Sequence, residues 1–366
     1  MFYASMGLSA SALSLALLAG GAAGVLGSVA GGWSASRFGP ADVLIAGSVL
    51  NVPLLSLLAT LTDRPIAAVA VASASIAVTQ SFSGPAATLV TGSSYTGNTV
   101  TVVAFHRIFL SSGVTVAPMA VAVVGQDDFA LLFALSALGS LATALLLVSE
   151  RARLLTAASH AARGVPADGS PPRESPGRHP MRLWAIVVVF GTAMAVYCQS
   201  TSAIPLSVQR ISADGQLYGA LIVLNSIFVI AFELPLSYLT ARLRWNIALG
   251  LGIALAGTGL AVSGLASGWA VCVTGFVVFS LGEAIFLPQA SASIATLAAP
   301  ADNARYQGYL SAAQSIGFAI GPGVGAFGVL HSPTLYWFVV VGISSIAAAV
   351  AFIAGNERKR RAVRIG

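Results

Sequence analysis

The sequence predicts an all-helical membrane protein made of two pseudo-symmetric helical bundles. Three observations predict this class. Of the 366 residues, 57% are hydrophobic and 8% are charged, whereas soluble domains carry roughly 25% charged residues. Apolar runs of about 20 residues, which are long enough to cross a bilayer as helices, fill most of the chain. One polar segment, residues 149–182, divides these runs into two groups.

The polar segment 149–182 contains six arginines, five prolines and three acidic residues. Such a segment buries too little apolar surface to offset the entropy lost on ordering, so we expect a mobile, solvated linker. The predicted organisation is an N-terminal bundle over 1–148, the linker, a C-terminal bundle over 183–354 and a basic tail over 355–366. We interpret the tail as a topology anchor that meets anionic lipid.

Eleven apolar runs are expected to span the membrane, five before the linker and six after it. Because each backbone polar group must be hydrogen-bonded inside the lipid, runs of this length predict helices rather than a barrel. No basic segment precedes the first run, which is therefore not typical of a secretory signal. The runs are 7–32, 42–61, 66–90, 99–124, 129–148, 183–207, 216–240, 245–266, 269–297, 306–330 and 334–354.

The positions of the basic residues predict the orientation, because cytoplasmic loops carry an excess of Lys and Arg. With Met1 outside, sixteen of the eighteen basic residues fall on the cytoplasmic side, and only Arg64 and Arg210 fall on the other. We therefore expect a multi-pass protein of the bacterial inner membrane, with the linker and the C-terminus in the cytoplasm.

The two groups of runs resemble copies of each other. The segments Gly113–Pro118 and Gly317–Pro322 lie 204 residues apart in equivalent runs, Pro85 and Pro288 lie 203 apart, and Arg37 and Arg242 lie 205 apart. Three anchors at nearly one offset predict a parallel internal repeat, which is typical of transporters. At this offset the run 183–207 has no counterpart, because the equivalent positions precede Ala4. We expect a missing first helix, from a start encoded further upstream or, alternatively, in a shortened paralogue.

The turn at residues 32–39, Gly-Trp-Ser-Ala-Ser-Arg-Phe-Gly, resembles the G-x-x-x-D-R-x-G turn of the major facilitator superfamily. Ser36 replaces the acid, Pro40 and Ala41 replace the usual basic pair, and the second copy around Arg242 also lacks the acid. The resemblance implies the major facilitator fold, with five plus six transmembrane helices in this chain. It also implies that Arg37 and Arg242 belong to an inner gate whose charge relay the substitutions weaken.

The glycine–proline segments resemble the G-x-x-x-G-P motif of drug–proton antiporters, and this resemblance implies export rather than uptake. Ala117 replaces the second glycine in the first copy. The segments 282–288 and 304–308 are also similar to bacterial drug–proton antiporters. Small residues four positions apart let helices pack closely, and proline removes a backbone hydrogen bond, so simple bundle packing is the alternative. The residues of the helix-packing motif are Gly113, Pro118, Gly317, Gly321 and Pro322.

Three charged side chains, Arg107, Glu233 and Glu283, lie within the apolar runs. Ionisable groups in a membrane are costly and usually functional. Glu283 stands fourteen residues into its run, about 21 Å deep at a rise of 1.5 Å per residue, and burial disfavours its charged form. We therefore expect Glu283 to carry a proton; the alternative is a protonated glutamate hydrogen-bonded to a neighbouring helix.

Arg107 and Glu233 each stand eight residues from the cytoplasmic end of their runs, about 12 Å deep. The family resemblance implies that their helices face each other across a central cleft. We therefore expect an Arg107–Glu233 salt bridge that closes the cytoplasmic side, and protonation of Glu233 would weaken it. The alternative is that each charge is satisfied within its own half or reaches towards water.

Four uncharged polar residues in other runs, Gln80, Gln199, Asn225 and Gln314, are candidates for lining a substrate cavity. Taken singly, such a residue more often forms a hydrogen bond between helices. Gln80 stands where the fourth helix of the family often carries an arginine, so the route of the proton is open at this point.

Enzyme function is not expected, because neither a His-Glu-x-x-His nor a Gly-x-Ser-x-Gly motif occurs. The Gly-x-Gly-x-x-Gly at 323–328 lies inside an apolar run rather than after a strand, and the four histidines show no metal spacing. The sequence predicts a monomeric secondary transporter working by alternating access, with a small-molecule substrate, surrounding lipid, no nucleic-acid partner, no metal and no cofactor. The expected activity is efflux of small amphipathic compounds or drugs, driven by a proton gradient. The alternatives are a sugar or metabolite transporter and a truncated membrane protein that does not transport.

Overall fold

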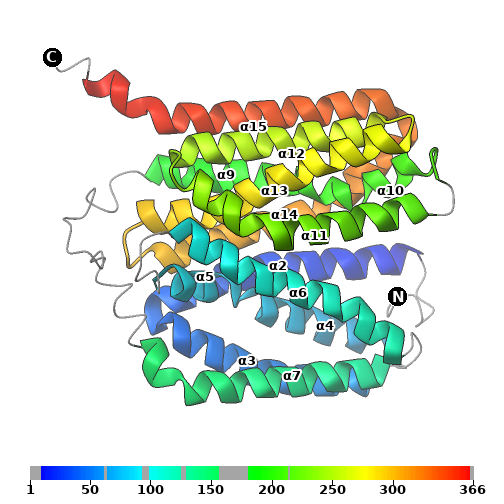
Figure 1. Ribbon diagram of the computed structural model, residues 1–366. Coiled ribbons are helices and arrows are strands. Elements are labelled where there is room, and N and C mark those ends of the chain that lie inside the picture. Colours follow the sequence, from blue (N-terminus) through cyan, green and yellow to red (C-terminus); the bar gives the residue numbers. More distant parts are fainter. Residues whose placement is uncertain are drawn as a thin grey trace. The chain divides into compact units, whose positions relative to one another are not determined.

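The computed structural model of the protein describes residues 10–61, 64–92, 99–124, 129–155, 180–212 and 215–362, and every regular element among them is a helix (Figure 1). In the first part of the chain these are α2 (Ala10–Phe38), α3 (Pro40–Ala59), α4 (Pro65–Gln80), α5 (Ser83–Gly92), α6 (Thr99–Val124) and α7 (Phe129–Ser149). The second part contains α9 (Pro180–Tyr197), the 3₁₀ turn η1 (Cys198–Ser200), α10 (Ala203–Val208), α11 (Gln216–Thr240), α12 (Trp245–Leu265), α13 (Trp269–Leu297), α14 (Asn303–His331) and α15 (Pro333–Ala362).

Ten helical segments of the described chain are long and apolar enough to cross a membrane. They coincide with ten of the eleven predicted runs, and α6, a helix of 26 residues, occupies the remaining run at 99–124. The all-helical fold class is therefore confirmed. The expected missing first helix stays a prediction.

Two of the predicted spans are interrupted, which the sequence reading did not anticipate. The run at 66–90 consists of α4 and α5 with a turn at Ser81–Phe82, and the run at 183–207 consists of α9, η1 and α10. A proline, Pro85 or Pro205, is the third residue of the helix after each break. Because proline has no N–H to donate, it fits the first turn of a helix better than the interior. Pro288, the predicted counterpart of Pro85, lies instead inside the unbroken α13.

The internal repeat is visible in the helix boundaries. α4 and α13 begin at residues 65 and 269, α6 and α14 at 99 and 303, and α7 and α15 at 129 and 333, an offset of 204 in each case. The packing repeats as well, because α3 lies against α7 as α12 lies against α15, and α2 lies against α4 as α11 lies against α13 (Figure 1). The parallel repeat predicted from three anchors therefore extends to most of the described helices.

The chain forms two compact units that do not follow its two halves strictly. Unit 1 comprises residues 1–97, 112–176 and 298–319, and unit 2 comprises residues 98–111, 177–297 and 320–366. The first part of α6 therefore packs within unit 2, and the first part of α14 packs within unit 1. Each unit thus contains half of a helix from the other half of the sequence.

Within unit 1, α14 approaches α2 very closely at two glycines. A Cβ atom added to Gly32 would lie 2.8 Å from the Cα of Gly308, and one added to Gly308 would lie 2.8 Å from the Cα of Gly32. One turn further along, the hydroxyl groups of Ser28 and Ser311 are hydrogen-bonded at 3.2 Å. Small side chains bring two membrane helices into backbone contact here, as is usual where lipid supplies no hydrophobic driving force.

The ends of the predicted linker are ordered where the structure describes them. Arg151 stands two residues after the end of α7 and bonds Asp42 in the first turn of α3, with its Nη2 2.9 Å from Oδ1. Arg182, predicted as part of the solvated linker, lies instead in the first turn of α9 and is 7% exposed. The expectation of mobility for residues 156–179 lies outside the described residues.

Candidate functional site

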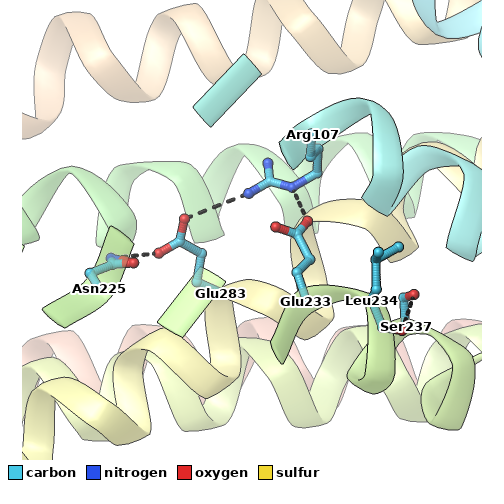
Figure 2. A network of polar contacts seen from close by, with 6 residues as sticks. All are labelled: Arg107, Asn225, Glu233, Leu234, Ser237 and Glu283. Carbon is cyan, nitrogen blue, oxygen red and sulfur yellow. Dashed lines mark hydrogen bonds and ion pairs between the residues drawn. The ribbon is translucent and has the colours of Figure 1, made fainter. Parts of the chain in front are cut away.

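The candidate site is a buried charged network in unit 2 (Figure 2). α11 contributes Glu233, which is 0% exposed, and α13 contributes Glu283, which is 4% exposed. The first part of α6 contributes Arg107. The three ionisable groups that the sequence places inside apolar runs therefore meet at one point.

Arg107 lies between the two carboxylates. Its Nε donates to Oε1 of Glu233 at 2.5 Å, and its Nη2 lies 3.6 Å from Oε1 of Glu283 (Figure 2). The predicted Arg107–Glu233 salt bridge is thus present, but the sequence did not predict that the same guanidinium also reaches Glu283. A planar guanidinium carries several donors in a fixed fork, which allows one arginine to serve two acceptors.

Glu283 has further partners besides Arg107. The Nδ2 of Asn225 on α11 donates to Oε2 of Glu283 at 2.9 Å. The phenol of Tyr197, at the end of α9, interacts electrostatically with the same carboxylate, and its ring packs against Phe279 with centroids 5.7 Å apart. Tyr197 was missed by the sequence reading. The sequence offered one local signal for Tyr197, its position two residues before the candidate cavity residue Gln199. It offered none for the contact with Glu283, which stands 86 residues further along the chain.

The carboxylate of Glu233 is less completely satisfied. Its Oε2 is buried and has no hydrogen-bond partner, and no ion pair other than that with Arg107 reaches Glu233 among the described residues. One arginine facing two carboxylates leaves one uncompensated negative charge when all three groups are ionised. In a low-dielectric interior such a charge is costly, and a single added proton removes it.

The local structure of α11 holds Glu233 in place next to a proline. Pro235 lies inside α11, where it leaves the carbonyl of Ala231 without its usual helical donor. The hydroxyl of Ser237 donates to the carbonyl of Leu234 at 2.8 Å, which gives the backbone an additional bond around the proline (Figure 2). The helix therefore continues through Pro235, with Glu233 and Asn225 two turns apart on it.

The comparisons with known proteins agree with this architecture. Residues 185–365 match the model of the Major Facilitator Superfamily. The human organic anion transporter MFSD10 (TETRAN) is 14% identical, with a TM-score of 0.71 over 96% of this chain and 87% of that one. The proton:xylose symporter XylE, solved with 6-bromo-6-deoxy-D-glucose, is 15% identical, with a TM-score of 0.70 over 95% and 88%. This chain has the major facilitator fold. The sequence matches none of the curated proteins.

The predicted cavity residues fall in both units of the major facilitator fold. In unit 1, Nε2 of Gln80 donates to Ser315 at 2.9 Å, and Gln314 is half-buried. In unit 2, Nε2 of Gln199 donates to the carbonyl of Gly321 at 3.1 Å, and Asn225 bonds Glu283. The observed contacts of Gln80 and Gln199 are therefore explained by hydrogen bonds between helices, the alternative to lining a cavity. A common substrate cavity stays a prediction.

The predicted gate arginines lie at helix ends and contact aromatic rings of their own helices. The guanidinium carbon of Arg37 lies 5.5 Å from the ring centre of Phe38, and that of Arg242 lies 5.2 Å from the ring centre of Tyr238. A gate role for Arg37 and Arg242 stays a prediction. Ser36, in place of the acid of the family's turn, donates to the carbonyl of Trp33 at 2.7 Å.

The helix-packing motif differs between its two copies. A Cβ atom at Gly321 would lie 2.8 Å from Cβ of Cys198, so α14 packs closely on η1 there. Among the described residues, no atom lies within 4 Å of a Cβ added at Gly113, so no close packing is seen at this glycine in that part of the chain. Pro322 lies within α14, and the side chain of Pro118 lies outside the described residues. Close packing at Gly317 stays a prediction.

Proposed function

We propose that this protein is a secondary transporter that works by alternating access and exports small amphipathic compounds in exchange for protons. The observation that carries the proposal is the buried network in which Arg107 faces both Glu233 and Glu283. The proposal places the protein in the bacterial inner membrane with the linker and the C-terminal tail in the cytoplasm. This orientation rests on the distribution of the arginines.

The charge of the network supports proton coupling. With one arginine and two glutamates, the ionised network carries a net charge of −1, and binding one proton makes it neutral. Glu283 is the proton carrier in this proposal, because its position near the middle of α13 is the depth at which transporters bind their coupling ions. Asn225 positions its carboxyl group through a hydrogen bond of 2.9 Å.

The same charge supports an amphipathic cation as the exported compound. A cation that enters the network can compensate the negative charge in place of the proton, so the two ligands compete for one site. Competition of this kind couples the outward movement of the compound to the inward movement of a proton. The resemblance of residues 317–322 to the antiporter motif supports the direction.

Arg107 and Glu233 form the gate in this proposal. Their helices, α6 and α11, come from the two halves of the sequence, and in this proposal alternating access separates Arg107 from Glu233 although both belong to unit 2. Protonation of Glu233 removes its charge and weakens its bond to Arg107. The proposal thereby links proton binding to opening of the gate.

The experiment is transport into everted membrane vesicles from a bacterial host that lacks its own drug exporters. Respiration acidifies the vesicle lumen, and accumulation of the fluorescent cation ethidium is followed with and without nigericin, which collapses the pH gradient. We expect accumulation that stops when nigericin is added. Accumulation unaffected by nigericin would remove proton coupling, and accumulation of labelled xylose in place of ethidium would identify a sugar transporter.

A matched arginine variant shows whether the transport depends on the network. Arg107→Gln should abolish accumulation, whereas Arg153→Gln, at an exposed arginine on the same side of the predicted membrane, should transport like the unmodified protein. Arg153 is a suitable control because its side chain is 84% exposed and bonds only the neighbouring Glu150 among the described residues.

A further inference from the structure

Arg182 is a buried arginine outside the charged network. It is the third residue of α9 and is 7% exposed. Its Nε is buried without a hydrogen-bond partner, and no ion pair involves Arg182 among the described residues. This arrangement differs from that of Arg107, whose guanidinium serves two carboxylates.

A buried arginine needs an anion. The guanidinium of arginine is a cation in proteins, and a buried charge is costly unless it is paired. The carboxylates whose side chains the structure describes in unit 2 are Glu233 and Glu283, and both belong to the network of Arg107. Neither is a partner of Arg182.

The start of α9 supplies additional donors for an anion. The N–H groups of Met181, Arg182 and Leu183 belong to the first turn, where a helix offers them no acceptor of its own. The helix dipole places partial positive charge at the same end. Because the Cα–Cβ bonds of a helix tilt towards its N-terminus, the side chain of Arg182 leaves the helix in the direction of this end.

The surroundings of this helix end are typical of the membrane interface. Met181 is 72% exposed and Trp184 is 47% exposed, and they flank Arg182 in sequence. Exposed tryptophan at the end of a membrane span usually lies at the level of the lipid headgroups. A lipid headgroup can therefore reach the start of α9 from the surrounding membrane.

We propose that Arg182 and the first turn of α9 bind the phosphate group of an anionic phospholipid. A phosphodiester presents two non-bridging oxygens that match the fork of a guanidinium, and free N–H groups at a helix start also bind phosphate. The site is separate from the charged network of the proposed transport function, so either proposal can fail without the other.

The experiment measures thermal unfolding of the purified full chain in a neutral detergent. The probes are dioleoyl phosphatidylglycerol, dioleoylglycerol (which has the same acyl chains without phosphate) and inorganic phosphate. Phosphatidylglycerol should raise the Tm of the unmodified protein in a saturable manner, because a ligand that binds the folded state stabilises it, and dioleoylglycerol should not. An equal increase with inorganic phosphate would assign the site to a soluble phosphate and overturn the lipid source.

The variant Arg182→Gln should lose this lipid response, while Arg153→Gln should keep it. Without phosphatidylglycerol, Arg182→Gln should be as stable as the unmodified protein or more stable, because it removes an uncompensated buried charge. With phosphatidylglycerol it should be less stable. Arg182→Lys, which keeps the charge but not the fork, should bind the lipid about tenfold more weakly, the factor that corresponds to loss of one charged hydrogen bond.

Two results would overturn the proposal. Arg182→Gln could lower the Tm equally with and without phosphatidylglycerol, which would mean that the partner is a carboxylate of the chain itself. Alternatively, Arg182→Gln could keep the full response to phosphatidylglycerol, which would place the lipid elsewhere.

Discussion

The polar contacts in the interiors of the two units occupy equivalent positions of the repeat but differ in charge. In unit 2, Arg107 of α6 bonds Glu233 and contacts Glu283. In unit 1, Ser311 of α14 bonds Ser28 at 3.2 Å. With the repeat offset of about 204 residues, Arg107 corresponds to Ser311, Glu233 to Ser28 and Glu283 to Gln80.

This comparison shows that the repeat fixes the scaffold while the side chains decide the chemistry. Both units place a half-helix from the other half of the sequence at this point. Unit 1 uses the contact for close packing of Gly32 and Gly308 and for neutral hydrogen bonds, including that between Gln80 and Ser315. Unit 2 uses it for the charged groups Arg107, Glu233 and Glu283, to which we assign proton exchange in the proposed function. The two contacts should therefore respond differently to substitution.

The largest effect is expected for Arg107→Gln, which leaves two buried carboxylates without a cation. Removing one partner of a buried ion pair costs about 3–5 kcal/mol, so the Tm of the purified protein should fall markedly and ethidium transport should be lost. Arg153→Gln should change neither. An Arg107→Gln protein with unchanged Tm would show that the two carboxylates are already neutral in the folded state.

The charge-exchanged variant Arg107→Glu/Glu233→Arg separates charge from position in the same network. It should recover part of the ethidium transport that each single variant loses, because the pair is restored in the opposite order. Failure to recover any activity would count against the gate role of the pair. Vesicles with matched amounts of each variant provide the measurement.

A smaller effect is expected for Gly308→Ala in unit 1. The added methyl group would lie 2.7 Å from the carbonyl oxygen of Ser28 and 2.8 Å from the Cα of Gly32, so the helices must move apart. Overpacking of this kind costs about 1–3 kcal/mol. Gly113→Ala is the matched control, because no atom of the described residues lies within 4 Å of the added methyl group. Equal Tm values for the two variants would contradict the close contact of α2 and α14.

The smallest effect is expected for Gln80→Leu, which removes the hydrogen bond to Ser315. A neutral hydrogen bond contributes about 0.5–1.5 kcal/mol, so the Tm should fall slightly, and transport and its dependence on the pH gradient should be retained. If Gln80→Leu instead abolished the pH dependence, the proton route would pass through unit 1 and the comparison between the units would fail.

The sequence was sufficient for those features that depend on length, composition and local spacing. Apolar runs predicted the spans, and the offset predicted the repeat now seen in the starts of α6 and α14. The contact of Arg107 with Glu233 was predicted because the family resemblance implied that their helices face each other. The contacts of Tyr197 and Asn225 with Glu283 were not predicted, since they depend on the rotation of α9 and α11 about their axes, which sequence spacing does not determine.

Other features were missed because they depend on tertiary packing. Arg182 is buried, although its polar neighbours in the sequence predicted a solvated position. Composition alone does not show which residue of a polar segment enters a helix. The interruption at Ser81 depends on how α2 packs there, since the backbone of Ser81 lies where a Cβ at Gly31 would be. Packing also determines that α6 and α14 each contribute to both units. Both are continuous helices, so no break in the sequence pattern marks where each passes from one unit to the other.

The central claim is that the network around Arg107 couples transport to a proton through Glu283. The direct test is ethidium accumulation by Glu283→Gln in everted vesicles that receive an imposed pH gradient. Glutamine retains the shape of the side chain but cannot bind or release a proton at this position. The account predicts no response to the gradient, with the Tm of the purified variant unchanged or raised, because one buried negative charge is removed. Accumulation that follows the gradient as in the unmodified protein would contradict the account and remove Glu283 from the mechanism.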